Sequence, residues 1–259
     1  ISYINNKIII NDKNIIKIID NDNIVFYDVA VKIRRRGCNM KLFVVKDYDA
    51  LSRKTAEIVA EQIRKKPDTI FCLPAGGSPI GMYEVLVQMY QRHEVDFSKL
   101  ITFDMDEYVG IGPQDENSYA YFMQKHFLKY VNVDPKNVHY PDGLAEDVDT
   151  MCKAYSEQIF AMGGLDLAIT GIGDDGHVAF NEPGETLYPR THAVDLEEST
   201  RKANARFFDG DITRVPKRAC SIGMEDIMRC KTFLVVASGK HKAELIRKTF
   251  HEEMVDPKW

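Results

Sequence analysis

The sequence predicts an α/β protein with a doubly wound, mainly parallel sheet and helices on both faces, in a Rossmann-like arrangement. Short apolar segments alternate with longer amphipathic segments from residue 40 onward, which is typical of parallel strands joined by helical crossovers. The 259 residues are 44% hydrophobic and 28% charged, an ordinary composition for one globular domain with a sizeable core. Glycines and acidic side chains directly follow several strands, where a doubly wound sheet holds its ligands.

The elements follow one another in a regular order. Strands are expected where a short apolar run is bounded by turn residues, at residues 42–45, 69–73, 99–104, 165–170, 219–224 and 232–237. A helix is expected between a cap at Asp47 or Asp49 and a stop at Pro67. Further helices are expected at residues 81–90, 117–130, 149–162 and 242–251, with a helical turn at 224–229. Residues 190–200 receive no assignment, and residues 203–208 open either a helix or a loop.

The first 39 residues differ from the rest, because Ile and Asn dominate the first 25. We assign no domain to residues 1–39 and place the functional domain at residues 40–259. Residues 34–37 (RRRG), shortly before Met40, are what a translated purine-rich ribosome-binding leader would encode. The alternative is a genuine, poorly ordered extension or a short strand pair.

Composition excludes several classes of protein. The net charge of -5 and the pI near 5.8 argue against nucleic-acid binding, although a local basic pocket for phosphate is compatible with them. No run approaches 18 apolar residues, so no membrane span is expected. The five cysteines are scattered without a CxxC pair, which predicts reduced thiols in a cytoplasm and no structural zinc.

The most informative stretch is residues 171–184 (GIGDDGHVAFNEPG), which follows a buried strand. Asp175 and His177 flank Gly176, where the backbone can bend enough for carboxylate and imidazole to meet. A carboxylate on one ring nitrogen fixes the tautomer and leaves the other nitrogen to move a proton. Glu182 is close enough to join this network. Metal binding by Asp174 with its neighbours is the rival interpretation, without a supporting ligand spacing.

Other strand ends carry anion-binding or acidic groups. Residues 74–79 (PAGGSP) lie between a strand and a helix, a common arrangement for presenting backbone N–H groups to phosphate. Asp106 follows the third strand, although a single acid there is more often a helix cap. Arg206 between apolar neighbours and Lys242 at a late strand-to-helix turn are candidate anion ligands, although residues of this kind are usually ordinary surface charges.

Taken together, these residues resemble the glucosamine-6-phosphate deaminase (isomerase) family from about Met40 to the end of the chain. The resemblance is carried by residues 73–79 (LPAGGSP), 102–108 (TFDMDEY), 171–184 and 204–208 (NARFF). The Asp-Gly-His element is shared with 6-phosphogluconolactonases, whereas the Phe-Asn-Glu-Pro and Met-Asp-Glu-Tyr elements point to the deaminase.

The resemblance implies a role for each candidate residue. Asp106 would take the C2 proton and return a proton to C1, and His177 would open the sugar ring with Asp175 and Glu182 tuning it. Phosphate would be held by Gly76, Gly77, Ser78, Arg206 and Lys242. The resemblance also implies that neither a metal nor an organic cofactor is needed. The products would be fructose 6-phosphate and ammonia, and the reaction would belong to the hydrolase class.

Some positions depart from the family pattern. Ala75 stands where many members have Thr, so one hydroxyl beside the phosphate loop is missing. The resemblance implies a homo-oligomer. Some members are activated by N-acetylglucosamine 6-phosphate through basic residues after the Asn-Glu-Pro element, and Glu185, His192 and Val194 occupy that region here, which argues against such activation. Family members continue past the position of Trp259 through another strand and helix, which this chain is expected to lack.

Two other functions fit part of the pattern. A 6-phosphogluconolactonase-type hydrolase would share the phosphate site without needing Asp106. A non-catalytic sugar-phosphate sensor would need none of the acid/base residues.

Overall fold

The computed structural model describes residues 7–10, 16–19, 28–34, 41–173, 176–182, 187–243 and 245–246. Several predictions therefore lie outside the described residues: those on Asp174 and Asp175, most of the RRRG run, Glu185, the helix end near residue 251 and the chain end at Trp259.

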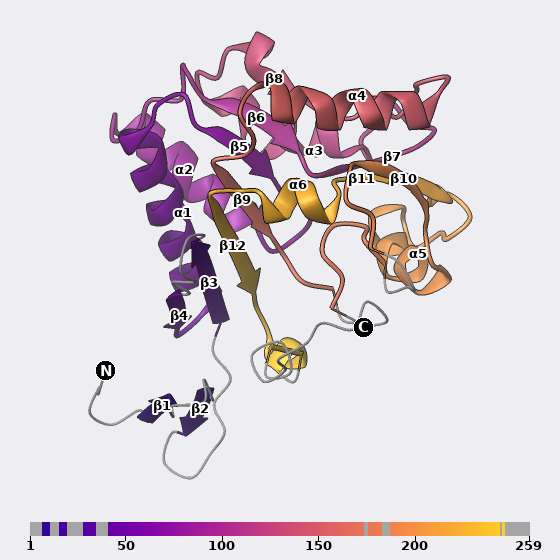
Figure 1. Cartoon of the computed structure of the whole chain (residues 1–259). Coiled ribbons are helices and arrows are strands. Elements are labelled where there is room, and N and C mark those ends of the chain that lie inside the picture. Colours follow the sequence, from indigo (N-terminus) through magenta and orange to yellow (C-terminus); the bar gives the residue numbers. More distant parts are fainter. Residues whose placement is uncertain are drawn as a thin grey trace.

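A seven-stranded sheet forms the centre of the molecule, in the order β4-β3-β12-β9-β5-β6-β8 (Figure 1). The pairs from β12 to β8 are parallel, and β3 runs antiparallel to both of its neighbours. The sheet is therefore mainly parallel, as predicted. Its strands are β4 (Lys41–Val45), β3 (Asp28–Arg34), β12 (Thr232–Ala237), β9 (Leu167–Thr170), β5 (Ile70–Leu73), β6 (Ile101–Asp104) and β8 (Val138–His139).

Helices cover both faces of this sheet, because the side chains of each buried strand alternate between two apolar clusters. Phe71 and Leu73 point to the larger cluster, under α1 (Tyr48–Lys65), α2 (Ile80–Gln91) and α3 (Tyr119–His126). Ile70 and Cys72 point to the opposite cluster, which includes side chains of α4 (Val148–Ala161) and α6 (Met224–Met228). Figure 1 shows α1 and α2 beside the sheet and α4 above it.

A second, three-stranded antiparallel sheet carries the chain that leaves β6. Its order is β10-β11-β7, from β10 (His192–Asp195), β11 (Arg218–Ser221) and β7 (Asp106–Tyr108). Met105 joins the two sheets, since its N–H donates to Leu73 O at 3.1 Å and its carbonyl accepts from Ile222 N at 2.9 Å. The change of sheet turns Asp106 out of the end of β6 and pairs it with Ser221.

Some elements differ from the predictions. The helix expected at residues 117–130 is capped by Ser118 but ends at His126, and Leu128–Tyr130 forms a separate 3-10 helix. Residues 190–200 form β10 and the start of α5 (Glu198–Asn204), and a 3-10 helix, Ala205–Phe207, follows. Periodicity did not show β10 because its side chains are partly buried or, at Asp195, exposed.

The N-terminal segment contributes strands to the fold. β1 (Lys7–Ile10) and β2 (Ile16–Ile19) pair antiparallel with each other, and β3 lies inside the main sheet between β4 and β12. Composition alone gave no basis for placing β3, because its neighbours in the sheet come from the two ends of the remaining chain.

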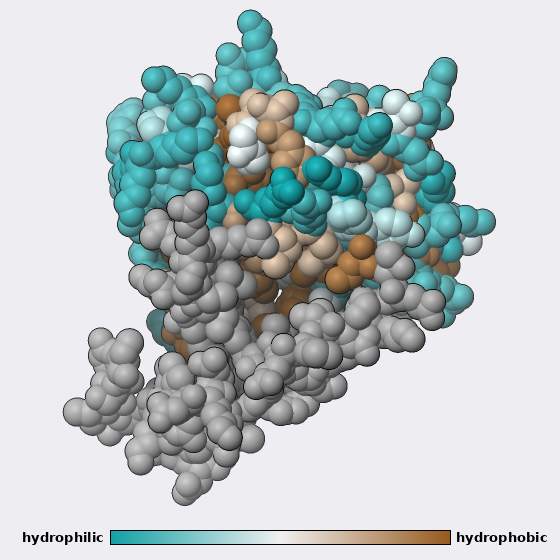
Figure 2. All heavy atoms as spheres, in the orientation of Figure 1, coloured by the Kyte–Doolittle hydropathy of each residue, from teal (hydrophilic) through white to brown (hydrophobic). Residues whose placement is uncertain are grey.

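Hydrophilic residues cover much of the described surface in the orientation of Figure 1, with hydrophobic residues nearer the middle of that face (Figure 2). Among the described residues no helix combines the length and apolar character that crossing a membrane requires.

Candidate active site

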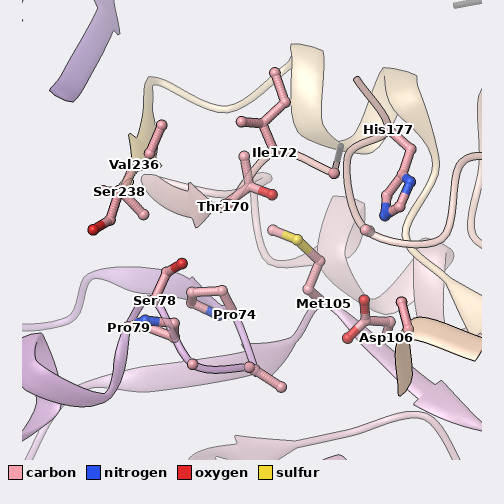
Figure 3. A pocket seen from close by; sticks show the side chains of 18 of the residues that line it. Pro74, Ser78, Pro79, Met105, Asp106, Thr170, Ile172, His177, Val236 and Ser238 are labelled. Atoms are coloured by element: carbon pink, nitrogen blue, oxygen red, sulfur yellow. The ribbon is translucent and has the colours of Figure 1, made fainter. Parts of the chain in front are cut away.

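A cavity of about 510 Å³ lies where β5, β6, β9 and β12 end. The segments that follow these strands line it, as expected for ligand binding at the carboxyl edge of an open sheet. Figure 3 shows Ser78, Pro79 and Ser238 at one end of the cavity and Asp106 and His177 at the other. Seven of the predicted site residues line this cavity: Gly76, Gly77, Ser78, Asp106, His177, Arg206 and Lys242.

The loop between β5 and α2 supplies the first end. Gly76 has φ +96°, a left-handed conformation that a residue with a side chain rarely adopts. Within the described parts of the chain, no hydrogen bond uses the N–H groups of Gly76, Gly77 or Ser78. The N-terminus of α2 follows at Ile80, so its partial positive charge adds to these donors. The loop is thus able to accept an anion through its backbone.

Two cations border the same cavity. Arg206 is exposed on the 3-10 helix Ala205–Phe207, and its guanidinium carbon lies 4.7 Å from the centre of the Phe207 ring. Lys242 is partly buried and ends the 3-10 helix Lys240–Lys242 after β12. Guanidinium and ammonium groups suit a phosphate in a cavity that also presents backbone N–H groups with no partner among the described residues.

Asp106 lies at the opposite end and is only 9% exposed. Burial, together with the charge of neighbouring Glu107, raises the pKa of Asp106 to about 8. A carboxyl group with this pKa can both take and give a proton near neutral pH.

Glu107, which follows Asp106 on β7, accepts three backbone hydrogen bonds. One carboxylate oxygen accepts from Tyr108 N at 2.8 Å and Tyr119 N at 3.0 Å, and the other accepts from Ala120 N at 2.9 Å. Burial raises the pKa of Glu107 to about 7 in spite of these donors. Glu107 thereby satisfies the first turn of α3 and ties it to the strand that carries Asp106.

His177 is held by its own loop. Gly173 N donates to His177 O at 2.9 Å, and a side chain at Gly173 would meet the imidazole at 2.4 Å. The side chain of Glu182 is 7% exposed, and its Oε2 lies 3.9 Å from His177 Nδ1. The pair becomes an ion pair when the imidazole is protonated, so Glu182 can stabilise the charged form.

Asn181 anchors the end of this loop to the small sheet. Its amide nitrogen donates to Ile222 O at 2.8 Å and to Ser221 Oγ at 3.3 Å, and Phe180 N donates to the same hydroxyl at 3.0 Å. Ser221 is also the β11 partner of Asp106. The loop with His177 and the strand with Asp106 are therefore fixed to one frame.

Sequence reasoning missed several residues that line the cavity. Tyr119 donates to Tyr108 Oη at 3.3 Å, Asn204 donates to the same oxygen at 2.9 Å, and Tyr48 contacts the loop after β5. Asn204 belongs to the NARFF segment at residues 204–208, but no sequence signal marked Tyr48 or Tyr119. Among the described residues, which exclude Asp174 and Asp175, no group of three or more His, Cys, Asp or Glu side chains could hold the metal ion of the rival interpretation.

The two ends of the cavity give it two chemical functions, anion binding and proton transfer, separated along its length (Figure 3). A ligand with a phosphate at one end and acidic C–H and ring oxygen atoms at the other would engage both.

Comparison with known proteins agrees with this arrangement. A family model described as glucosamine-6-phosphate isomerases/6-phosphogluconolactonase matches residues 46–258. The glucosamine-6-phosphate deaminase of Thermoanaerobacter sp. (strain X514) is 45% identical over 215 residues, which are 83% of this chain and 85% of that protein.

Solved structures share the fold. A monomeric glucosamine-6-phosphate deaminase has a TM-score of 0.79 at 37% identity, covering 83% of this chain and 89% of its own. A 6-phosphogluconolactonase from Trypanosoma cruzi has a TM-score of 0.65 at 16% identity, covering 83% of this chain and 87% of its own, which shows a common fold alone. From the family model and the identity over most of its length, the chain belongs to the family of glucosamine-6-phosphate isomerases and 6-phosphogluconolactonases.

Proposed function

We propose that this protein converts glucosamine 6-phosphate into fructose 6-phosphate and ammonia. The observation that carries the proposal is Asp106, a buried carboxyl with a pKa of about 8 in a cavity whose other end presents backbone donors that no described residue uses. Isomerisation needs one carboxylate that gives and takes a proton away from bulk water. Lactone hydrolysis does not need such a group at this position.

The first steps are assigned to the two ends of the cavity. Gly76, Gly77 and Ser78 bind the phosphate through backbone N–H groups, with Arg206 and Lys242 neutralising its charge. His177 moves the proton that opens the pyranose ring, and Asp175 and Glu182 stabilise its charged form.

The later steps belong to Asp106. Its carboxylate takes the proton from C2, which gives an enolamine, and returns a proton to C1. The resulting C2 imine adds water and releases ammonia, leaving the ketone of fructose 6-phosphate. The overall reaction consumes one water, which places the enzyme in the hydrolase class.

The test is turnover of the purified chain on glucosamine 6-phosphate, with ammonia and fructose 6-phosphate measured separately. Asp106→Asn should lower kcat at least about 10²-fold, the scale of one lost general acid–base group. Hydrolysis of 6-phosphogluconolactone is the competing assay. An active wild type that keeps its lactonase rate in Asp106→Asn, without releasing ammonia, would show the lactonase instead.

Two further properties complete the proposal. The four described cysteines, Cys72, Cys152, Cys220 and Cys230, are free and buried, which supports a reducing compartment such as the cytoplasm.

The assembly is proposed to be a homo-oligomer, although one solved relative is a monomeric deaminase. Light scattering behind size exclusion decides between the two, since a single species at 29.6 kDa is the monomer.

A further inference from the structure

Tyr48, the first residue of α1, places its hydroxyl against the backbone of the loop after β5. The hydroxyl lies 3.1 Å from both Gly77 O and Ser78 O, and it accepts from Gly81 N at 3.0 Å. Because it has one proton, it donates to one of the two carbonyls at a time while accepting the Gly81 N–H. One side chain therefore links the loop to the first turn of α2.

These contacts decide where the loop's donors point. A peptide group is planar and trans, so fixing the Gly77 carbonyl also fixes the direction of the Ser78 N–H. Gly81 N is a first-turn donor of α2 with no partner inside the helix, and Tyr48 satisfies it. The N–H groups of Gly76, Gly77 and Ser78 keep no partner within the described residues. The tyrosine thus occupies the helix donor and leaves the loop donors available.

A second tyrosine fixes the start of the same loop. Tyr83 on α2 is fully buried, and its hydroxyl donates to Pro74 O at 2.8 Å. The loop is therefore held at both ends by phenol hydroxyls from the helices beneath it. Only Tyr48 also lines the cavity.

We propose that Tyr48 is a positioning residue for phosphate: its hydroxyl holds the Gly76–Ser78 N–H groups in the arrangement that accepts the anion. Ala75 offers no side-chain hydroxyl to the loop. The shape of the loop therefore depends on contacts to its backbone, such as those from the hydroxyls of Tyr48 and Tyr83. This inference rests on the proposed function for the identity of the substrate, but not for the binding of phosphate itself.

The test compares Tyr48→Phe with Tyr90→Phe. Tyr90 is on the same α2 helix as Gly81, packs its ring 6.1 Å from that of Phe97, and contributes no hydrogen bond to the loop. In Tyr48→Phe, KM for glucosamine 6-phosphate and the inhibition constant of inorganic phosphate should both rise about tenfold, the effect of losing one or two hydrogen bonds. The kcat should stay within about twofold of wild type. Tyr90→Phe should change none of these.

A merely structural role predicts a different result. Tyr48→Phe would then lower the unfolding temperature and leave the phosphate inhibition constant and KM unchanged, which overturns the proposal. A fall in kcat at constant KM overturns it as well. If the wild type fails to release ammonia, the proposed function fails, yet calorimetric binding of inorganic phosphate to the same variants still decides the role of Tyr48.

Amide hydrogen exchange on the unchanged protein covers the case in which Tyr48→Phe does not fold. Inorganic phosphate should slow exchange at Gly76, Gly77, Ser78 and Gly81 together, because one hydroxyl couples the loop to the helix. Protection of the loop with no change at Gly81 would contradict that coupling.

Discussion

Asp106 and Glu107 are adjacent buried carboxyls with different tasks. Both have a raised pKa, chiefly because burial disfavours their charge, but Glu107 has three backbone donors and ionises first, near pH 7. Its charge then opposes ionisation of Asp106, whose pKa is about 8. The environment of each residue thereby separates a structural carboxylate from a proton-transfer group.

The pKa of Asp106 predicts the pH dependence of the reaction. Since the base works only when ionised, kcat/KM should rise with pH below about 8 and level off above it. Glu107→Gln removes the neighbouring charge and should move the midpoint to lower pH. A pH series with each variant checks this, after correction for the ionisation of the substrate. Exposed Glu116→Gln is the control, and a flat wild-type profile from pH 6 to about 8.5 would contradict the assignment of Asp106.

The carboxyl of Asp106 should also make the fold less stable as pH rises. The pKa of Asp106 is raised from 3.8 to about 8, so between these values the unfolded chain loses a proton that the folded chain keeps. The stability it contributes is complete below about pH 4 and is lost as pH rises through about 8. Asp106→Asn removes this penalty, so its gain in unfolding temperature over wild type should be larger at pH 8 than at pH 5.

Exposed Asp68→Asn is the matched control for that comparison. It should shift the unfolding temperature equally at both pH values. An equal shift for Asp106→Asn would mean that its carboxyl titrates normally.

At the scale of elements, α2 packs against α1 at Gly81. A Cβ there would lie 2.3 Å from Ser52 Oγ, 2.9 Å from Ser52 Cβ and 3.1 Å from Tyr48 Cε1. The close approach brings the first turn of α2 within reach of the Tyr48 hydroxyl. Glycine at this position therefore serves the packing of two helices, because its φ is not in the left-handed region.

Gly81→Ala should destabilise the protein by about 1–3 kcal/mol, because overpacking outweighs the gain in helix propensity of about 1 kcal/mol. Urea unfolding measures the loss. Ser52→Ala removes the nearest atom and should cost little alone, since Ser52 Oγ has no partner among the described residues. The double variant should recover part of the loss, and additivity of the two single effects would contradict this packing.

At the scale of the whole molecule, an ionic cluster closes the edge of the sheet opposite the cavity. Asp166 is 2% exposed and precedes β9, and its carboxylate pairs with Lys66 after α1 and with Lys231 before β12, the latter at 2.7 Å. It also accepts from Ile70 N at 2.9 Å. Burial favours a higher pKa for Asp166, but these donors outweigh it and lower the pKa. The cluster links the starts of three parallel strands.

Asp166→Asn should reduce the free energy of unfolding by about 2 kcal/mol, since charged hydrogen bonds are lost but the lysines are partly solvated. Because the pKa of Asp166 is lowered in the folded protein, the difference in free energy of unfolding between wild type and Asp166→Asn should be complete at pH 7. It should shrink as the pH falls below about 4. Urea unfolding at several pH values checks this. The kcat should not change, and a large loss of kcat would mean that the two edges of the sheet are coupled.

The alternation of apolar runs with helical periodicity predicted the mainly parallel sheet and most elements, because burial on both faces leaves a plain pattern in β5, β9 and β12. It failed for β10, whose partly buried side chains give no alternation, and for β3, whose partners β4 and β12 bracket nearly the whole remaining chain. Pairing over such distances depends on tertiary packing.

The sequence by itself determined the family, the central parallel strands of the main sheet and the residue types of the candidate site, since strand-end motifs are local features of the chain. Only the tertiary structure brought Gly76, Asp106, His177 and Lys242 to one cavity. It also brought the carboxylate of Glu107, on β7, to the backbone N–H groups in the first turn of α3. It alone revealed the Tyr48 contact, because a tyrosine at the start of a helix carries no sign of the loop 30 residues away that it holds. Side-chain types are written locally, whereas burial, pKa and partners arise from what the folded chain packs around them.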